Sequence, residues 1–148
     1  VAGGDKQTLR LAAGLLFGLG GAPVIYYGTE VGLSQPRPKA PHMEEARHPM
    51  LWGAAQDGEL LGFFRRWIAA RREHNALTWG TINTLLLDDQ RALWLVERKH
   101  AGSRVLIAVN CGRGEQEVAL PDGTFSDLEG REFRGKMPVA ARSVTLLV

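Results

Sequence analysis

The first half of the chain carries apolar residues at helical spacing on both sides of a short, continuously apolar run. One predicted helix follows Asp5, a residue type that caps helix N-termini, and stops at the Gly20–Gly21 pair. A second helix is predicted from about residue 58 to residue 74, with one apolar face. Between them, residues 23–27 (PVIYY) show no polar alternation, which is typical of a parallel strand buried on both faces.

In the second half of the chain, the helical period gives way to short runs typical of strands. Turn-forming residues such as Pro121-Asp122-Gly123 separate these runs, and no long helical pattern interrupts them. We therefore expect two units: helix, strand, long loop and helix in residues 1–77, then an antiparallel β-domain in residues 78–148. The predicted strands of the β-domain are 92–97, 104–110, 116–120 and 143–148.

Composition narrows the class of protein without identifying it. Of the 148 residues, 45% are hydrophobic and 23% are charged, a balance typical of a globular protein rather than a disordered one. The net charge of +2 comes from 18 basic and 16 acidic residues, so it gives little reason to expect nucleic acid as a partner. The apolar stretch 11–27 contains four glycines and a proline, and we predict no membrane span there.

The single cysteine, Cys111, excludes an intrachain disulfide framework and a multi-cysteine metal site. It favours a reducing compartment, and hence the cytoplasm, without identifying it. His42, His48, Glu44 and Glu45 share the long loop but follow no fixed ligand spacing, so we expect neither a metal nor another cofactor. Four further polar residues, Arg65, Arg66, Arg71 and Arg72, are interpreted as a solvated helix face; a nucleic-acid module built on them would lose affinity steeply with salt.

Four segments resemble the end of an α-amylase superfamily glycoside hydrolase. Residues 21–32 (GAPVIYYGTEVG) resemble the family's pattern around its eighth barrel strand, and residues 47–52 (RHPMLW) resemble its R-x-P-M-x-W pattern. Residues 68–77 are similar to the last barrel helix, and residues 105–110 (VLIAVN) to the central strand of the C-terminal β-domain. The four occur in the family's order and spacing over nearly the whole chain. One departure is Glu45-Ala46, where the family often has Asp-Pro, so substrate preference is not readable.

The resemblance implies a fold class of α/β plus all-β: the terminal helix-strand-helix portion of a (β/α)₈ TIM barrel, followed by an antiparallel β-sandwich. It also implies that the chain is a C-terminal fragment, cut internally before Val1. The parent would be a retaining glycosidase or transglycosylase acting on α-glucosidic bonds of malto-oligosaccharides or related sugars. Its partners would be that α-glucan substrate and the N-terminal remainder of the barrel, with no nucleic acid and no membrane.

The family's catalytic carboxylates lie upstream of these segments, the last of them beside a His-Asp motif that this chain lacks. Asp5 is therefore interpreted as a helix cap, no catalytic residue is expected, and the chain by itself should be inactive. A catalytically inactive α-amylase-like binding or scaffolding protein remains the alternative, since the deciding residues would lie upstream.

Candidate substrate-binding residues follow from the rule that loops after barrel strands build the active-site face. We expect Tyr27, Glu30 and Arg47 to bind substrate, because a phenol, a carboxylate and a guanidinium can all hydrogen-bond sugar hydroxyls. Each of these residues also has a purely structural alternative. Tyr27, like Tyr26, could pack in the barrel core, and Arg47 could anchor the loop through an ion pair. Glu30 could cap backbone amides of the loop or pair with an arginine. Trp52 is expected to pack in the interior, with stacking on a sugar ring as its alternative.

Overall fold

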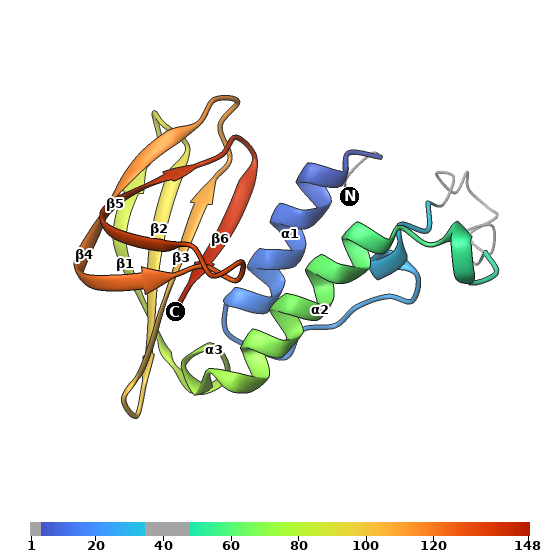
Figure 1. Ribbon diagram of the computed structural model, residues 1–148, viewed down its shortest axis with the longest axis horizontal. Coiled ribbons are helices and arrows are strands. Elements are labelled where there is room, and N and C mark those ends of the chain that lie inside the picture. Colours follow the sequence, from blue (N-terminus) through green and yellow to red (C-terminus); the bar gives the residue numbers. More distant parts are fainter. Residues whose placement is uncertain (1–3, 35–47) are drawn as a thin grey trace.

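The computed structural model describes residues 4–34 and 48–148, and in it a group of helices covers a β-sandwich (Figure 1). The helices are α1 (Lys6–Gly18), α2 (Gly58–Glu73) and α3 (Asn75–Trp79), and short 3₁₀ turns at Thr29–Val31 and Gly53–Ala55 lie between α1 and α2. The strands are β1 (Thr81–Asp88), β2 (Leu93–His100), β3 (Ser103–Asn110), β4 (Gln116–Ser126), β5 (Glu132–Val139) and β6 (Ser143–Leu147).

Both long helices begin at an aspartate cap, and the sequence predicts the first of these, Asp5. The Asp5 carboxylate accepts hydrogen bonds from the Gln7 amide at 2.9 Å and the Thr8 hydroxyl at 2.7 Å. The Thr8 hydrogen bond is the largest of the contacts that hold the Asp5 pKa below its usual range. Asp57 caps α2 in the same way, accepting from the Leu60 amide at 3.0 Å. Asp5 thus acts as a helix cap, as predicted.

The apolar run 23–27 lacks the strand that the sequence predicts. It has no regular secondary structure, and Figure 1 shows it returning alongside α2 after α1 ends. Val24 is 82% exposed, although Ile25 packs against the core. A parallel strand needs neighbouring strands to satisfy its backbone groups and cover its faces. In the described part of the chain, no strand lies beside this run. The run therefore has the amino-acid composition of a buried strand but forms no backbone hydrogen bonds to a neighbouring strand.

The β-domain is a sandwich of two antiparallel sheets, as predicted. One sheet has the order β1-β2-β3-β6, and the other contains β4 and β5. Strands β2, β3 and β6 match the predicted runs, and β4 begins at the predicted residue 116 but extends beyond the predicted end at residue 120. The sequence does not predict β1, β5 or the short helix α3. A cluster from both sheets fills the space between them, and it includes Leu95, Leu106, Val118, Met137 and Leu147.

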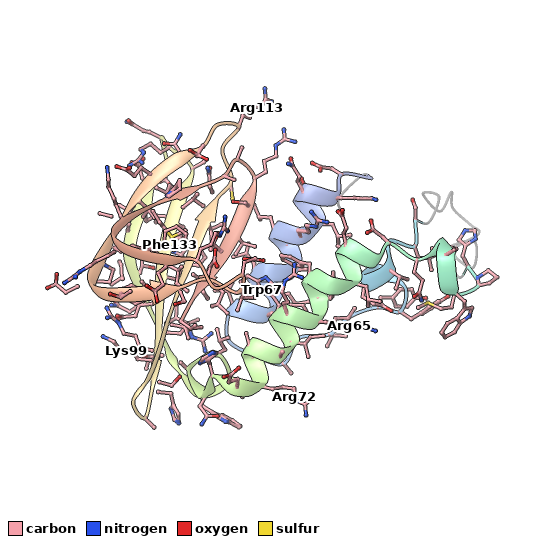
Figure 2. All side chains as sticks on the ribbon, in the orientation of Figure 1. Arg65, Trp67, Arg72, Lys99, Arg113 and Phe133 are labelled. Carbon is pink, nitrogen blue, oxygen red and sulfur yellow. The ribbon has the colours of Figure 1, made fainter. Side chains whose placement is uncertain are left out.

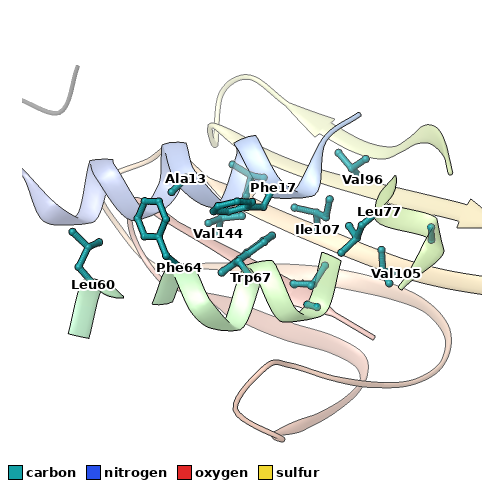
Figure 3. Close-up of a cluster of buried hydrophobic side chains, with 14 residues drawn as sticks. Ala13, Phe17, Leu60, Phe64, Trp67, Leu77, Val96, Val105, Ile107 and Val144 are labelled. Carbon is teal, nitrogen blue, oxygen red and sulfur yellow. The ribbon is translucent and has the colours of Figure 1, made fainter. Parts of the chain in front are cut away.

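The second face of the four-stranded sheet lies under the helices, and this gives the molecule its main core (Figure 3). Phe17 of α1 meets Phe64 of α2 edge to face, with ring centroids 5.7 Å apart. Trp67 and Leu77 join this cluster from the helices, while Val96, Val105, Ile107 and Val144 join it from the strands. The cluster therefore contains residues from both predicted units, 1–77 and 78–148. The division of the chain into these two units remains a prediction.

Two glycines let α1 approach the sheet closely. A Cβ built on Gly14 would overlap Val144 Cγ1, and one on Gly18 would lie 2.7 Å from Ile107 Cδ1. Because protein interiors are packed to crystal-like density, neither neighbour has free space into which it can withdraw. These glycines, which at first only interrupt an apolar stretch, therefore set the distance between the helix and the sheet. Within the described residues, no helix is long and apolar enough to cross a membrane.

Candidate functional site

The candidate site is a glycine-bounded turn that follows the apolar run. Gly28 and Gly32 both have left-handed backbone angles, with φ of 83° and 79°, and enclose the 3₁₀ turn Thr29–Val31. The Leu33 amide donates to the Gly28 carbonyl at 2.8 Å, and a Cβ on Gly28 would lie 2.6 Å from Leu33 Cδ2. Both the angle and the close approach require glycine at position 28. The G-x-x-x-G spacing of the motif is thus explained by the backbone geometry.

This turn is fixed at the N-terminal end of α2. The Asp57 amide donates to the Val31 carbonyl at 3.0 Å, and Val31 itself is buried. Lys6 at the start of α1 pairs with Asp57, and its hydrogen bond is the main cause of the lowered Asp57 pKa. In a barrel, the loop after a strand and the start of the next helix lie on the active-site face. The turn therefore occupies the position expected of a substrate-facing loop.

Tyr27 and Tyr26 present a pair of rings at the start of the turn. Their centroids are 4.7 Å apart, and the Tyr27 hydroxyl donates to the His48 carbonyl at 2.8 Å. The side chains are 42% and 53% exposed respectively, so neither is a core residue of this chain as the structural alternative expects. This hydrogen bond joins the start of the long loop to His48, a residue within the loop. The sequence does not predict this contact, because every residue has a backbone carbonyl and the residue type does not indicate which carbonyl accepts the hydrogen bond.

Glu30 lies in the same turn, and one of its carboxylate oxygens is shielded without a partner. Its Oε2 is buried and accepts no hydrogen bond from any described residue. This oxygen therefore neither caps a backbone amide nor pairs with an arginine in the described part of the chain. The Nε2 of His48 is likewise shielded and has no hydrogen-bond partner among residues 4–34 and 48–148. A buried carboxylate oxygen without a donor is costly, so this position favours an additional donor from outside the described residues.

Arg47, the third predicted binding residue, lies outside the described residues, as do His42, Glu44 and Glu45. Among residues 4–34 and 48–148, no group of three or more potential metal ligands comes together. Trp52 is 75% exposed beside the turn Gly53–Ala55, so the prediction that it packs in the interior is wrong for this chain. The described part of the chain contains no surface that covers its indole.

Two arginines hold the chain reversal that leads into the site. Arg71 of α2 donates to the carbonyls of Leu19 at 3.1 Å, Gly21 at 2.6 Å and Phe17. Arg98 of β2 donates to the carbonyl of Gly18 at 2.6 Å and to those of Gly80 at 2.9 Å and Thr81 at 3.1 Å. Together they satisfy carbonyls that the end of α1 leaves without helical partners, and their charge opposes the negative helix end.

The prediction of a solvated arginine face on α2 holds for three of its four members. Arg65, Arg66 and Arg72 are exposed, and Figure 2 shows Arg65 and Arg72 on the side of α2 away from the strands. Arg71 contradicts the prediction because it bonds to the end of α1. Arg98 is only 1% exposed; burial lowers its pKa, and the nearby positive charge of Arg71 lowers it further. No sequence pattern marks either role.

No family model matches the chain, but curated relatives match nearly all of it. Alpha-amylase 2 of Dictyoglomus thermophilum is 32% identical over 97% of this chain and 26% of its own length. A cyclomaltodextrinase of Thermoanaerobacter pseudethanolicus is 28% identical over 99% of this chain and 24% of its own length. The chain thus spans about a quarter of the length of these relatives. A Geobacillus thermoleovorans α-amylase complexed with acarbose has the same fold, with a TM-score of 0.78 and 21% identity over 95% of this chain and 33% of its own.

The fold, helices that cover an antiparallel β-sandwich, places the chain in the class of proteins that share the fold of this α-amylase. Within that class, the chain belongs to the α-amylase superfamily. The sequence motifs and the curated relatives both indicate this family, and both cover nearly the whole chain.

Proposed function

We propose that this chain forms the C-terminal part of a retaining glycoside hydrolase or transglycosylase that acts on α-glucosidic bonds of malto-oligosaccharides or related sugars. The observation that carries the proposal is the turn Tyr27–Gly32. It lies at the start of α2, where a barrel binds substrate, and it presents the Glu30 carboxylate with one shielded oxygen that has no donor among the described residues. A sugar hydroxyl is a suitable donor for such an oxygen.

In this proposal, Tyr27, Glu30 and Arg47 bind and orient the sugar, and none of them performs the chemistry. A retaining glycosidase needs two carboxyl groups about 5 Å apart across the scissile bond. The other acidic groups that the structure describes near the turn already have partners: Asp57 caps α2 and pairs with Lys6, and Glu59 pairs with Arg10 at 3.2 Å. Arginine stays protonated at neutral pH and cannot act as a general acid or base. The chain by itself is therefore expected to be inactive.

The N-terminal remainder of the barrel is the proposed partner of the first unit. Val24, Tyr26, Leu16 and Trp52 all expose large apolar surface in this chain. Large exposed apolar side chains are typical of surfaces that a partner covers. Neighbouring barrel strands would supply both that cover and the hydrogen bonds that residues 23–27 do not make here.

The test of inactivity uses the 148-residue chain and its Glu30→Ala variant on maltodextrins and on nitrophenyl α-glucosides. Equal rates at the background level are expected from both proteins. Turnover by the unchanged chain above that of Glu30→Ala would contradict the proposal, because it would require catalytic groups within this sequence. In a complete enzyme, Glu30→Gln should weaken sugar binding, since the neutral amide accepts a weaker hydrogen bond than the carboxylate.

A further inference from the structure

The ion pair between Lys6 and Asp57 joins the first turn of α1 to the N-terminal cap of α2. Figure 1 shows that both helices begin at the same end of the molecule, where the turn Tyr27–Gly32 also lies. Neither residue is a candidate for binding sugar, because the Asp57 carboxylate caps α2 and the Lys6 ammonium lies against that carboxylate. The position of the pair nevertheless connects it to the turn.

The two oxygens of Asp57 have different partners. Oδ1 accepts from the Leu60 amide at 3.0 Å, whereas Oδ2 is shielded from solvent and lies against the Lys6 ammonium. In the described part of the chain, no other cation lies within ion-pairing distance of Oδ2. An exposed ion pair contributes little to stability, but a shielded carboxylate oxygen depends strongly on its partner. The Asp57 side chain is only 14% exposed, so Lys6 holds it in one position.

The turn rests on Asp57 through two contacts. The Asp57 amide donates to the Val31 carbonyl at 3.0 Å, and a Cβ built on Gly32 would lie 3.3 Å from the Asp57 Cβ. The described residues before Asp57, 48–56, form neither an α-helix nor a strand, so regular secondary structure does not hold it from that side. Whatever fixes Asp57 therefore also fixes the backbone of the turn.

Lys6 projects from a helix start that is itself held in place. Its neighbour Asp5 caps α1 and pairs with Arg142, in the loop before β6, at 3.2 Å. One helical turn further along α1, Arg10 pairs with Glu59 of α2 at 3.2 Å. The Glu59 side chain is 88% exposed, and this second pair makes no contact with the turn that the structure describes. The two pairs thus join the same helices, but only the first reaches the turn.

We propose that Lys6 and Asp57 are positioning residues for sugar binding: their ion pair fixes the start of α2 against the start of α1 and thereby holds the turn Tyr27–Gly32 in place. That the turn binds sugar rests on the proposed function, whereas the restraint of the turn by the pair does not. A binding group held in one geometry loses less entropy when its ligand arrives.

The restraint is tested on the 148-residue chain by amide hydrogen exchange, after circular dichroism has shown that each variant unfolds cooperatively at a similar temperature. Lys6→Met should speed exchange of the Asp57 amide about tenfold, while the Trp67 amide in the middle of α2 should not change. Lys6→Arg keeps the charge and should restore slow exchange. Arg10→Met is the matched control, because it removes the other ion pair between the same helices, and it should leave the Asp57 amide unchanged.

Two results of this experiment would overturn the restraint. The first is unchanged exchange of the Asp57 amide in folded Lys6→Met. The second is an equal increase in Arg10→Met, which would mean that the turn responds to any loss of contact between α1 and α2. Neither result bears on the proposed function, because the experiment contains no sugar.

The role in sugar binding is tested in a complete enzyme with malto-oligosaccharides as substrate. A turn that binds sugar without performing chemistry predicts that Lys6→Met raises KM about threefold to tenfold and leaves kcat within about twofold, with Lys6→Arg close to the unchanged enzyme. A lower kcat at unchanged KM would contradict a positioning role in binding. Faster amide exchange together with unchanged KM and kcat would refute the binding of sugar by the turn, and with it the observation that carries the proposed function, while the restraint itself would stand.

Discussion

Replacing Arg98 with alanine should be among the most destabilising single changes in this chain. The guanidinium is 1% exposed and donates to the carbonyls of Gly18, Gly80 and Thr81 at 2.6–3.1 Å. Gly18 ends α1, whereas Gly80 and Thr81 join α3 to β1. One side chain of β2 therefore connects the helices to the first strand of the sheet.

The magnitude follows from the hydrogen bonds lost and the groups left behind. Hydrogen bonds to a charged group contribute about 1.5–3 kcal/mol each, which gives an upper limit of about 4.5–9 kcal/mol for three. Water entering the space vacated by the side chain would satisfy part of the exposed carbonyls, so we expect a loss of about 4 kcal/mol. For a domain of this size, that corresponds to a fall in Tm of about 8–16 °C. Arg98→Lys should lose about half as much, because an ammonium keeps the charge but cannot span three acceptors.

Thermal unfolding followed by circular dichroism, with urea unfolding at 25 °C as a second measurement, would test this prediction. Arg72→Ala is the matched control, since Arg72 is an exposed arginine on α2, and its effect should stay within about 0.5 kcal/mol. If Arg98→Ala melted within about 2 °C of Arg72→Ala, the carbonyls would not depend on Arg98. The account of how the helices join the sheet would then be refuted.

Three further changes test other parts of the structure. Gly14→Ala should cost about 1–3 kcal/mol in urea unfolding because its Cβ overlaps Val144, whereas Gly62→Ala on α2 should be neutral or stabilising. For Glu97, burial opposes ionisation, but hydrogen bonds from Lys99 and Arg104 outweigh it and hold the pKa below its usual 4.5. The stabilising effect of Glu97 is therefore present above pH 4.5 and is lost as the pH falls through the lowered pKa, so the stability gap between the unchanged chain and Glu97→Gln should be full at neutral pH and should narrow in acid below pH 4.5. In a complete enzyme, Arg47→Ala should lower kcat/KM about tenfold to a hundredfold without changing the shape of the pH profile, whereas loss of one limb of that profile would contradict a purely orienting role.

Local patterns in the sequence determine the long helices and four of the six described strands, although β4 extends beyond its predicted end. The caps at Asp5 and Asp57 and the apolar faces of α1 and α2 act within a few residues of one another, so the sequence displays them directly. Strands β2, β3 and β6 are buried runs rich in branched side chains. The motif around Gly28 also determines the turn, because its left-handed angle belongs to the residue type.

The elements that escape prediction depend on neighbours distant in sequence. Strand β1 lies at the sheet edge and exposes most of its residues, and β5 contains a glycine and a proline, so neither shows clear alternation. Both are strands because a partner pairs with them. Residues 23–27 show the reverse: their composition is that of a buried strand, but the described part of the chain supplies no partner.

The same distinction separates the expected roles of the arginines from the observed ones. Arg71 has the same residue type and the same helix as its solvated neighbours Arg65 and Arg72, yet it caps carbonyls about 50 residues earlier in the chain. Arg98 bonds to a carbonyl 80 positions away. A sequence fixes which groups can donate and accept, through local residue chemistry. Only the tertiary structure decides which donors meet which acceptors, because burial and packing bring together groups that no local period connects.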